Sequence, residues 1–190
     1  MSATSLSRRV LALRGARERM NGVREEIYAT VAGTSDEDLL APPLDGGWSA
    51  AEVLDHISRA ERGVAKGFPA LERGEPLKVP RIAWLYRLPM GLAFLDLKFR
   101  APKPVRARPR SEIRPSEVLE RLRASRAALL DYVEKTGEER FSRMVLPHFV
   151  LGRFDGLDWF RFIGRHEARH LGQIRRVLAE VRPSGPTEDR

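Results

Sequence analysis

The most constraining feature of this chain is an unbroken helical pattern over residues 159–181, which contains two histidines four positions apart. A helix advances about 100° per residue, so the regularly spaced apolar residues and both histidines fall within an arc of about 80° on one face. That face comprises Trp159, Ile163, His166, His170, Ile174, Val177 and Val181. His166 and His170 therefore lie one turn apart on the stripe that the helix is expected to bury, where both can reach one ion.

These two histidines allow two interpretations. A single buried histidine is commonly a core residue that has found a hydrogen-bond partner. Two on one stripe favour a shared ligand, because each imidazole has to be desolvated and given a partner. A third histidine at a matching place on another helix would favour a metal site over unrelated core residues.

Such a histidine ends the second informative stretch, residues 47–56 (GWSAAEVLDH). Ser49 and Glu52, three residues apart, form the pattern of a capping box, and Trp48 before the cap can pack on Val53. A helix therefore begins here, and its apolar stripe continues to residue 71. His56 lies about 75° from the centre of that stripe, at its edge, about two turns into the helix.

The remaining pattern predicts an all-α chain. Apolar residues recur at helical spacing over residues 5–33 and 115–136, Ser35 begins a short helical turn, and no segment has a clear strand pattern. Together with the two histidine-bearing helices, these segments predict a four-helix bundle. We expect a single domain over residues 1–182 and a disordered tail over residues 183–190.

Residues 74–115 interrupt the helical pattern with seven prolines. We expect one or two short amphipathic helices over residues 82–99, broken at Pro89, and an extended basic stretch over residues 102–109. Between residues 78 and 110, nine Lys and Arg residues oppose Asp96 alone, so this segment accounts for the whole net charge of +8.

This basic segment has three interpretations. The first is a cover over the bundle end or a dimer seam. The second is an entrance for anionic substrates or a weak membrane-surface contact through residues 78–110. The third is nucleic-acid binding, because Trp84, Tyr86 and Phe99 lie near the basic residues. No motif that reads DNA or RNA accompanies the charge, so specific nucleic-acid recognition is not expected.

Composition limits the chemistry. The chain has no Cys, which excludes disulfides, Cys-ligated zinc and Cys nucleophiles and leaves His and carboxylate groups as the strong metal ligands. Its hydrophobic content of 42% and charged content of 32% are typical of a soluble globular protein. No segment has the length and apolarity of a membrane span, and the basic N-terminus does not resemble a signal peptide. We therefore expect a cytoplasmic protein.

Three neutral imidazoles suit a divalent ion with an open coordination position. Gln173, about 60° from the centre of its helical stripe, is a candidate outer-shell residue. It is interpreted either as a hydrogen-bond partner of a bound water or substrate, or as a helix-capping or interhelical amide. Glu52 is either the capping-box carboxylate alone or an outer-shell acceptor for an imidazole N–H. His148 lies in a connection and is interpreted as a structural or surface residue.

Residues 47–56, the LPHF sequence at 146–149 and residues 159–174 together resemble the DinB-like (DinB/YfiT) family of metal-dependent enzymes. The resemblance implies a four-helix bundle with non-sequential topology, a site for zinc, nickel or iron, and a homodimer. His56, His166 and His170 match the three ligand positions of the family. Some of its members transfer low-molecular-weight thiols to electrophiles or isomerise substrates with such thiols.

The leading hypothesis is a metal-dependent enzyme that acts on a small-molecule substrate. Its favoured reaction is a thiol-dependent S-transfer, with a low-molecular-weight thiol as a second cofactor. Two other classes stay open, a non-catalytic, stress-associated metal-binding protein and a basic peripheral binding protein whose metal is structural.

Overall fold

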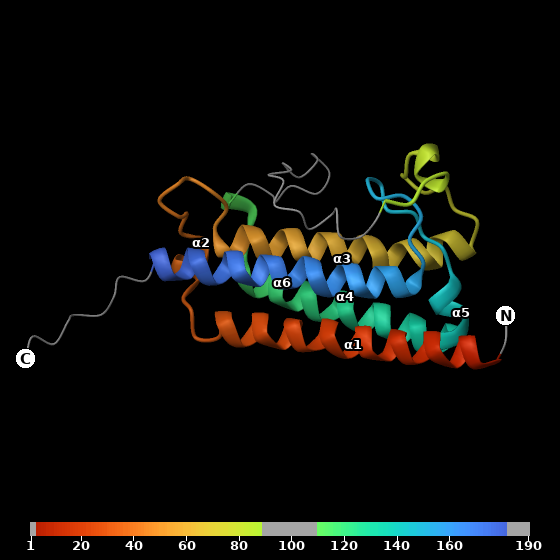
Figure 1. The fold of residues 1–190 in the computed structure, drawn as a ribbon. Coiled ribbons are helices and arrows are strands. Elements are labelled where there is room, and N and C mark those ends of the chain that lie inside the picture. Colours follow the sequence, from red (N-terminus) through yellow and green to blue (C-terminus); the bar gives the residue numbers. More distant parts are fainter. Residues whose placement is uncertain (1–2, 89–109, 182–190) are drawn as a thin grey trace, which may run out of the picture.

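The computed structural model describes residues 3–88 and 110–181. Four long helices pack as a bundle, with shorter helices at its ends (Figure 1). The long helices are α1 (Ala3–Val31), α3 (Ala50–Glu72), α4 (Pro115–Thr136) and α6 (Gly156–Val181). The shorter ones are α2 (Asp36–Leu40), α5 (Glu138–Arg143) and the 3-10 turns η1 (Arg81–Trp84) and η4 (Arg110–Glu112). The predicted all-α four-helix bundle is confirmed. Within the described ranges, no helix combines the length and apolarity needed to cross a membrane.

The four long helices form two parallel pairs. α1 and α6 run side by side in one direction, and α3 and α4 run together in the opposite direction (Figure 1). Gly164 lies at the contact of the first pair, where a Cβ would meet the Cα of Met20 at 3.4 Å, an ordinary van der Waals distance. A chain that joins two parallel helices has to return along the bundle. The connection between α3 and α4, which contains the Pro-rich insert of residues 74–115, joins opposite ends of the bundle.

Local signals place most helix ends where the sequence predicts them. The Oγ of Ser49 accepts the N–H of Glu52 at 3.2 Å, and Oε2 of Glu52 accepts the N–H of Ser49 at 2.8 Å, which confirms the capping box. Gly137, with φ 85°, ends α4 in a conformation that other residues rarely adopt. Helix α5 was not predicted, because a helix of six residues is too short to show a period. Its Phe141 is fully buried in the core.

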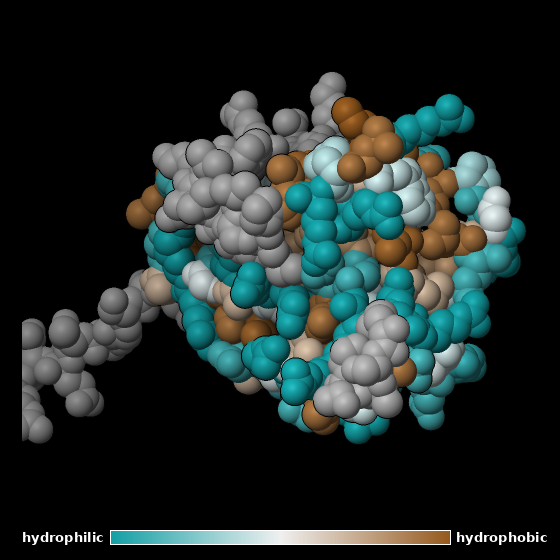
Figure 2. Space-filling model, turned by 45° about the vertical axis from the view of Figure 1, so that its right-hand side comes forward, coloured by the Kyte–Doolittle hydropathy of each residue, from teal (hydrophilic) through white to brown (hydrophobic). Residues whose placement is uncertain are grey.

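The first part of the insert lies against the loop before α6. The backbone oxygen of Tyr86 accepts the N–H of Arg153 at 2.8 Å, and its hydroxyl donates to the backbone oxygen of Val150 at 2.7 Å. Five exposed apolar side chains belong to these two segments: Ile82, Leu85, Leu88, Phe149 and Val150. Figure 2, in which this end of the bundle comes forward, shows a group of brown, apolar side chains there.

Much of the insert lies outside the described residues. The short helices expected over residues 82–99 are described only as far as residue 88, where η1 provides one 3-10 turn. The extended stretch at 102–109 and the tail at 183–190 are outside the described ranges, so these expectations stay predictions.

The core consists of two apolar clusters, one in each half of the bundle. On each long helix, one buried charged residue separates the members of the two clusters. On α1, for example, Arg24 stands between Met20 of one cluster and Ile27 of the other. We call these four residues the charged layer: Arg24 (α1), Glu61 (α3), Arg126 (α4) and Glu167 (α6).

Candidate metal centre

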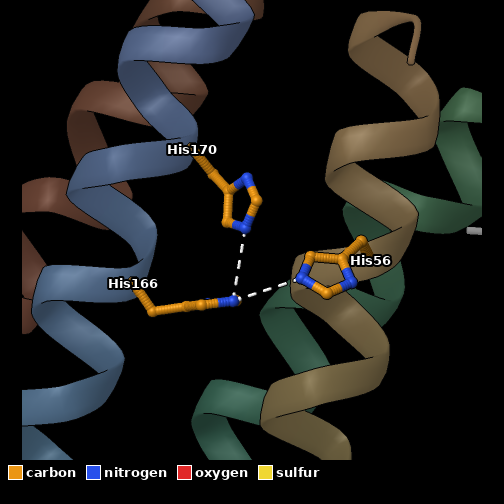
Figure 3. A group of neighbouring side chains, drawn as sticks. All are labelled: His56, His166 and His170. Atoms are coloured by element: carbon orange, nitrogen blue, oxygen red, sulfur yellow. Dashed lines mark hydrogen bonds between the residues drawn. The ribbon is translucent and has the colours of Figure 1, made fainter. Parts of the chain in front are cut away.

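The three histidines that were predicted to share an ion lie together between α3 and α6 (Figure 3). Nε2 of His166 is 3.2 Å from Nε2 of His56 and also 3.2 Å from Nε2 of His170. His56 is buried, whereas the other two side chains are partly accessible. The structure therefore brings together all three predicted residues, and their role as metal ligands stays a prediction.

The spacing and chemistry of this group fit a divalent ion. Two imidazole nitrogens bound tetrahedrally to one zinc ion at about 2.0–2.1 Å lie about 3.3 Å apart. The two observed separations of 3.2 Å agree with this value. A neutral imidazole has one N–H and one lone pair, so three converging nitrogens cannot all satisfy one another by hydrogen bonds. A cation that accepts a lone pair from each nitrogen would satisfy all three.

Gln173 orients the ring of His170. Its Oε1 lies 3.0 Å from Nδ1 of His170, three residues earlier on α6. An amide oxygen only accepts hydrogen bonds, so Nδ1 carries the ring proton and Nε2 presents its lone pair to the other two histidines. The sequence favoured a contact with water or substrate, or a capping or interhelical amide. The structure places Gln173 directly behind a candidate ligand, an outer-shell position at which ligating histidines usually have a hydrogen-bond partner.

Burial keeps the imidazoles of α6 neutral. The pKa of His170 is lowered to about 4, first by burial and then by the neighbouring His56, against an opposing contribution from the Gln173 hydrogen bond. Burial is also the main reason that the pKa of His166 lies well below its usual value, and the adjacent imidazoles lower it further. Because neutral imidazole is the form that binds metal ions, both rings are in the ligating state at neutral pH.

Two aromatic rings flank the histidines. The ring of Trp48 lies 5.2 Å from that of His56, and the ring of Phe162 stacks at 5.5 Å on that of His166. Both aromatic side chains are half-buried and form part of the packing around the site. Glu52 has the capping-box role described above, and its alternative role as an acceptor behind an imidazole stays a prediction.

His148 does not belong to this group. Its Nδ1 accepts the backbone N–H groups of Val150 and Leu151, each at 3.1 Å, and its ring packs against Phe154 and Trp159. Burial lowers the pKa of His148 to about 4. It is a structural residue that closes the loop before α6, in agreement with the sequence-based interpretation.

The charged layer beside the histidines was missed by the sequence analysis. Glu167 directly follows His166, and Glu61 lies five residues after His56. The sequence does show one charged residue at helical spacing within the apolar stripe of each long helix, two of them arginine and two glutamate. It does not show which of these residues form ion pairs in the fold. Burial by itself would raise the pKa of Glu61. The positive charges of Arg24 and Arg126 outweigh this effect and lower the pKa below its usual value. Burial raises the pKa of Glu167, while three N–H donors from the two arginines favour its ionised form.

The fold and the site define a class of helical-bundle proteins with a candidate three-histidine metal centre between two long helices. A model of the DinB superfamily matches residues 19–174, most of the chain, so the protein belongs to the DinB superfamily. YuaE, an uncharacterized protein of Bacillus subtilis (strain 168), is 30% identical over 162 residues, which cover 85% of this chain and 96% of YuaE.

Two solved structures share the fold. TT2238, described as a four-helix bundle protein, superimposes with a TM-score of 0.56 at 22% identity, over 86% of this chain and 98% of its own. YfiT from Bacillus subtilis is described as a probable metal-dependent hydrolase with an unusual four-helix bundle topology. It superimposes with a TM-score of 0.52 at 17% identity, over 93% of this chain and 87% of its own.

The lowered pKa values predict a pH dependence of stability for the metal-free protein. A buried histidine whose pKa is near 6.5 in the unfolded chain and about 4 in the fold stays neutral in the folded state at pH values where the unfolded chain binds a proton. Its contribution to the free energy of unfolding is therefore complete above pH 6.5. That contribution is lost as the pH falls from 6.5 towards 4. For His148 alone the loss amounts to about 3 kcal/mol.

Asparagine at this position can still accept the loop N–H groups but does not titrate, so His148→Asn should reduce the slope of unfolding free energy against pH over this interval. Urea denaturation of both proteins at several pH values measures the two slopes. Equal slopes would show that His148 titrates normally in the fold.

Proposed function

We propose that this protein is a metal-dependent enzyme that holds one divalent ion with His56, His166 and His170. The observation that carries the proposal is the convergence of the three Nε2 atoms, with His166 at 3.2 Å from each of the others. Membership of the DinB superfamily and the description of YfiT as a probable metal-dependent hydrolase support it. Zinc, nickel and iron all suit imidazole ligands, so the proposal names the class of ion rather than the element.

Each residue of the site has a distinct part. The three imidazoles are neutral, so a bound ion keeps its full positive charge. When bound, such an ion lowers the pKa of a coordinated water or thiol and so supplies a nucleophile near neutral pH. Gln173 holds His170 in the tautomer that directs Nε2 to the centre. Because His166 and His170 are partly accessible, a small molecule can approach the group from their side.

The first candidate reaction is transfer of a low-molecular-weight thiol to an electrophilic substrate. The chain has no Cys, so any thiol that reacts here has to come from a small molecule. In such a transfer the thiol sulfur forms a bond to the electrophilic carbon, the leaving group departs with its electron pair, and the thiol proton is released. The cofactor in this case is the thiol together with the metal ion.

A second candidate reaction is hydrolysis, in which water takes the place of the thiol. The observation that favours it is the description of YfiT, whose structure shares the fold of this chain. The non-catalytic metal binder and the basic peripheral binder differ from both in having no turnover. The homodimer, the cytoplasmic location and the role of residues 78–110 stay predictions.

The first prediction of this proposal concerns metal content. Purified protein should bind about one divalent ion per chain, and His166→Ala or His170→Ala should abolish binding with the helical content retained. His148→Asn is the matched control, because His148 is also a buried histidine but lies outside the group, and it should keep the ion. Elemental analysis of untagged protein measures the content. Wild-type protein that remains metal-free after dialysis against zinc, nickel and iron would contradict the proposal.

A second prediction concerns Gln173. Gln173→Leu keeps the size of the side chain but removes the acceptor for Nδ1 of His170, so zinc affinity should fall about 10–100-fold at unchanged stoichiometry. Competition with a chromophoric chelator measures this change. Arg176→Gln, an exposed change on the same helix, should leave the affinity as it is. If Gln173→Leu also has wild-type affinity, the amide has no part in ligand orientation.

The third prediction tests the chemistry. A cobalt-substituted protein should develop a sulfur-to-metal absorption band when low-molecular-weight thiols are added, and His56→Ala should abolish it. Turnover of a chloro-nitroarene with the same thiol would assign the transferase reaction, whereas turnover of esters or amides without a thiol would assign the hydrolase. A cobalt protein that responds to no thiol or anion and turns over neither substrate class would favour the non-catalytic metal binder.

A further inference from the structure

The charged layer contains one residue from each of the four long helices. Arg24, Glu61 and Glu167 are each at most 2% exposed, and Arg126 is 7% exposed. Arginine and glutamate are rarely so deeply buried unless they are paired. The position of these residues between two apolar clusters therefore calls for a physical reason.

The two glutamates are held by the same two arginines. Arg24 donates from Nη2 to Glu61 at 3.0 Å and from Nε to Glu167 at 3.3 Å. Arg126 donates from Nε to Glu61 at 2.5 Å and from Nη2 to Glu167 at 2.8 Å. Each carboxylate thus contacts a guanidinium group from α1 and another from α4, and the four charges cancel.

Neighbouring groups complete the hydrogen bonds of the layer. The hydroxyl of Ser125 donates to Glu61 at 2.6 Å. Nη1 of Arg24 donates to the backbone oxygen of Leu122 at 2.9 Å, and Nη1 of Arg126 donates to Oδ1 of Asn21 at 2.8 Å. Such a fully bonded group of charges is specific in geometry, whereas apolar side chains of the same volume would commonly give equal or higher stability. Its advantage over an apolar layer is therefore the arrangement that it selects.

The arrangement selected is the register of the helices. The layers above and below contain aliphatic side chains, which would still pack on aliphatic side chains if α3 moved by one turn, about 5.4 Å, past α6. The same movement would take Glu61 away from both arginines and leave buried charges unpaired. Only one register satisfies all four charges at once.

The selected register is also the one in which the histidines meet. His56 lies five residues before Glu61 on α3, about 7.5 Å along the helix axis. On α6, His166 and His170 stand on either side of Glu167. We propose that the charged layer positions the metal centre by fixing α3 against α6, so that His56 reaches the two histidines of α6. This inference rests on the proposed metal binding, and Glu61 and Glu167 act in it as positioning residues.

The experiment replaces the whole layer by apolar side chains of similar length, in the combined variant Arg24→Met, Glu61→Met, Arg126→Met and Glu167→Met. We expect a folded, helical protein whose unfolding midpoint in urea equals or exceeds that of wild type. Its zinc dissociation constant should rise at least about tenfold, since the ligands are no longer held in place. A wild-type zinc affinity in this folded variant would overturn the proposal.

If the combined variant does not fold, two milder variants test the same positioning role of the charged layer. Glu61→Gln keeps the shape of the side chain but removes one charge, and Leu129→Ala leaves a cavity in an apolar cluster while all four charged residues are kept. Both should lower stability. Under conditions in which both proteins are folded, only Glu61→Gln should weaken zinc binding and alter the visible spectrum of the cobalt form. Equal effects of the two variants would overturn the positioning role.

The register itself can be measured without a metal. Because the chain has no Cys, spin labels can be attached specifically at Arg62→Cys on α3 and Arg176→Cys on α6, both exposed positions. The distribution of label distances should be narrow with the native layer and broad or shifted without it. If wild type binds no zinc but the distribution broadens, the proposed function fails and the register role stands. If the distribution does not change, the register role fails whatever the zinc result.

Discussion

The register of the four long helices depends on the contact of two arginines with two glutamates in the middle of the bundle. Arg24, Glu61, Arg126 and Glu167 come from four helices that are distant in sequence, and their charges are satisfied only by one another and by nearby polar groups. Removal of a single partner from such a group costs about 3–5 kcal/mol, because it leaves a buried charge without compensation. Any arrangement of the helices that separates the four residues is therefore excluded.

Because of this constraint, the apolar clusters, the charged layer and the histidines have different roles in the bundle. The two apolar clusters supply the hydrophobic stabilisation, the charged layer selects one register, and the histidines beside it are brought into contact by that register. Glu61 and Arg126 both lie near the middle of their helices, α3 and α4, where they are in contact. Because these two helices run parallel, the connection between them has to join opposite ends of the bundle.

The sequence was sufficient for features that depend on local spacing. The capping box of Ser49 and Glu52, the start of α4 at Pro115 and the face shared by His166 and His170 were all predictable from residues within two turns of one another. The ion pairs of the charged layer were not, because each helix shows only its own charge and the partners are set by tertiary packing. Gln173 was a candidate outer-shell residue from the sequence, but its partner was not predictable, since helical spacing gave its angle and not the rotamer that brings it to His170.

The charged layer also bears on how open the proposed metal centre is. A buried structural zinc site is normally closed by four protein ligands. Two carboxylates of the ligand-bearing helices belong to the layer: Glu61 lies five residues after His56, and Glu167 directly follows His166. Both are held by guanidinium groups, and neither can turn towards the imidazoles without leaving an arginine unpaired. The same pairs that position the histidines thus keep these two carboxylates from becoming a fourth ligand. An ion held by three neutral imidazoles beside a charge-neutral layer, as we propose, would keep its full positive charge for an incoming small molecule.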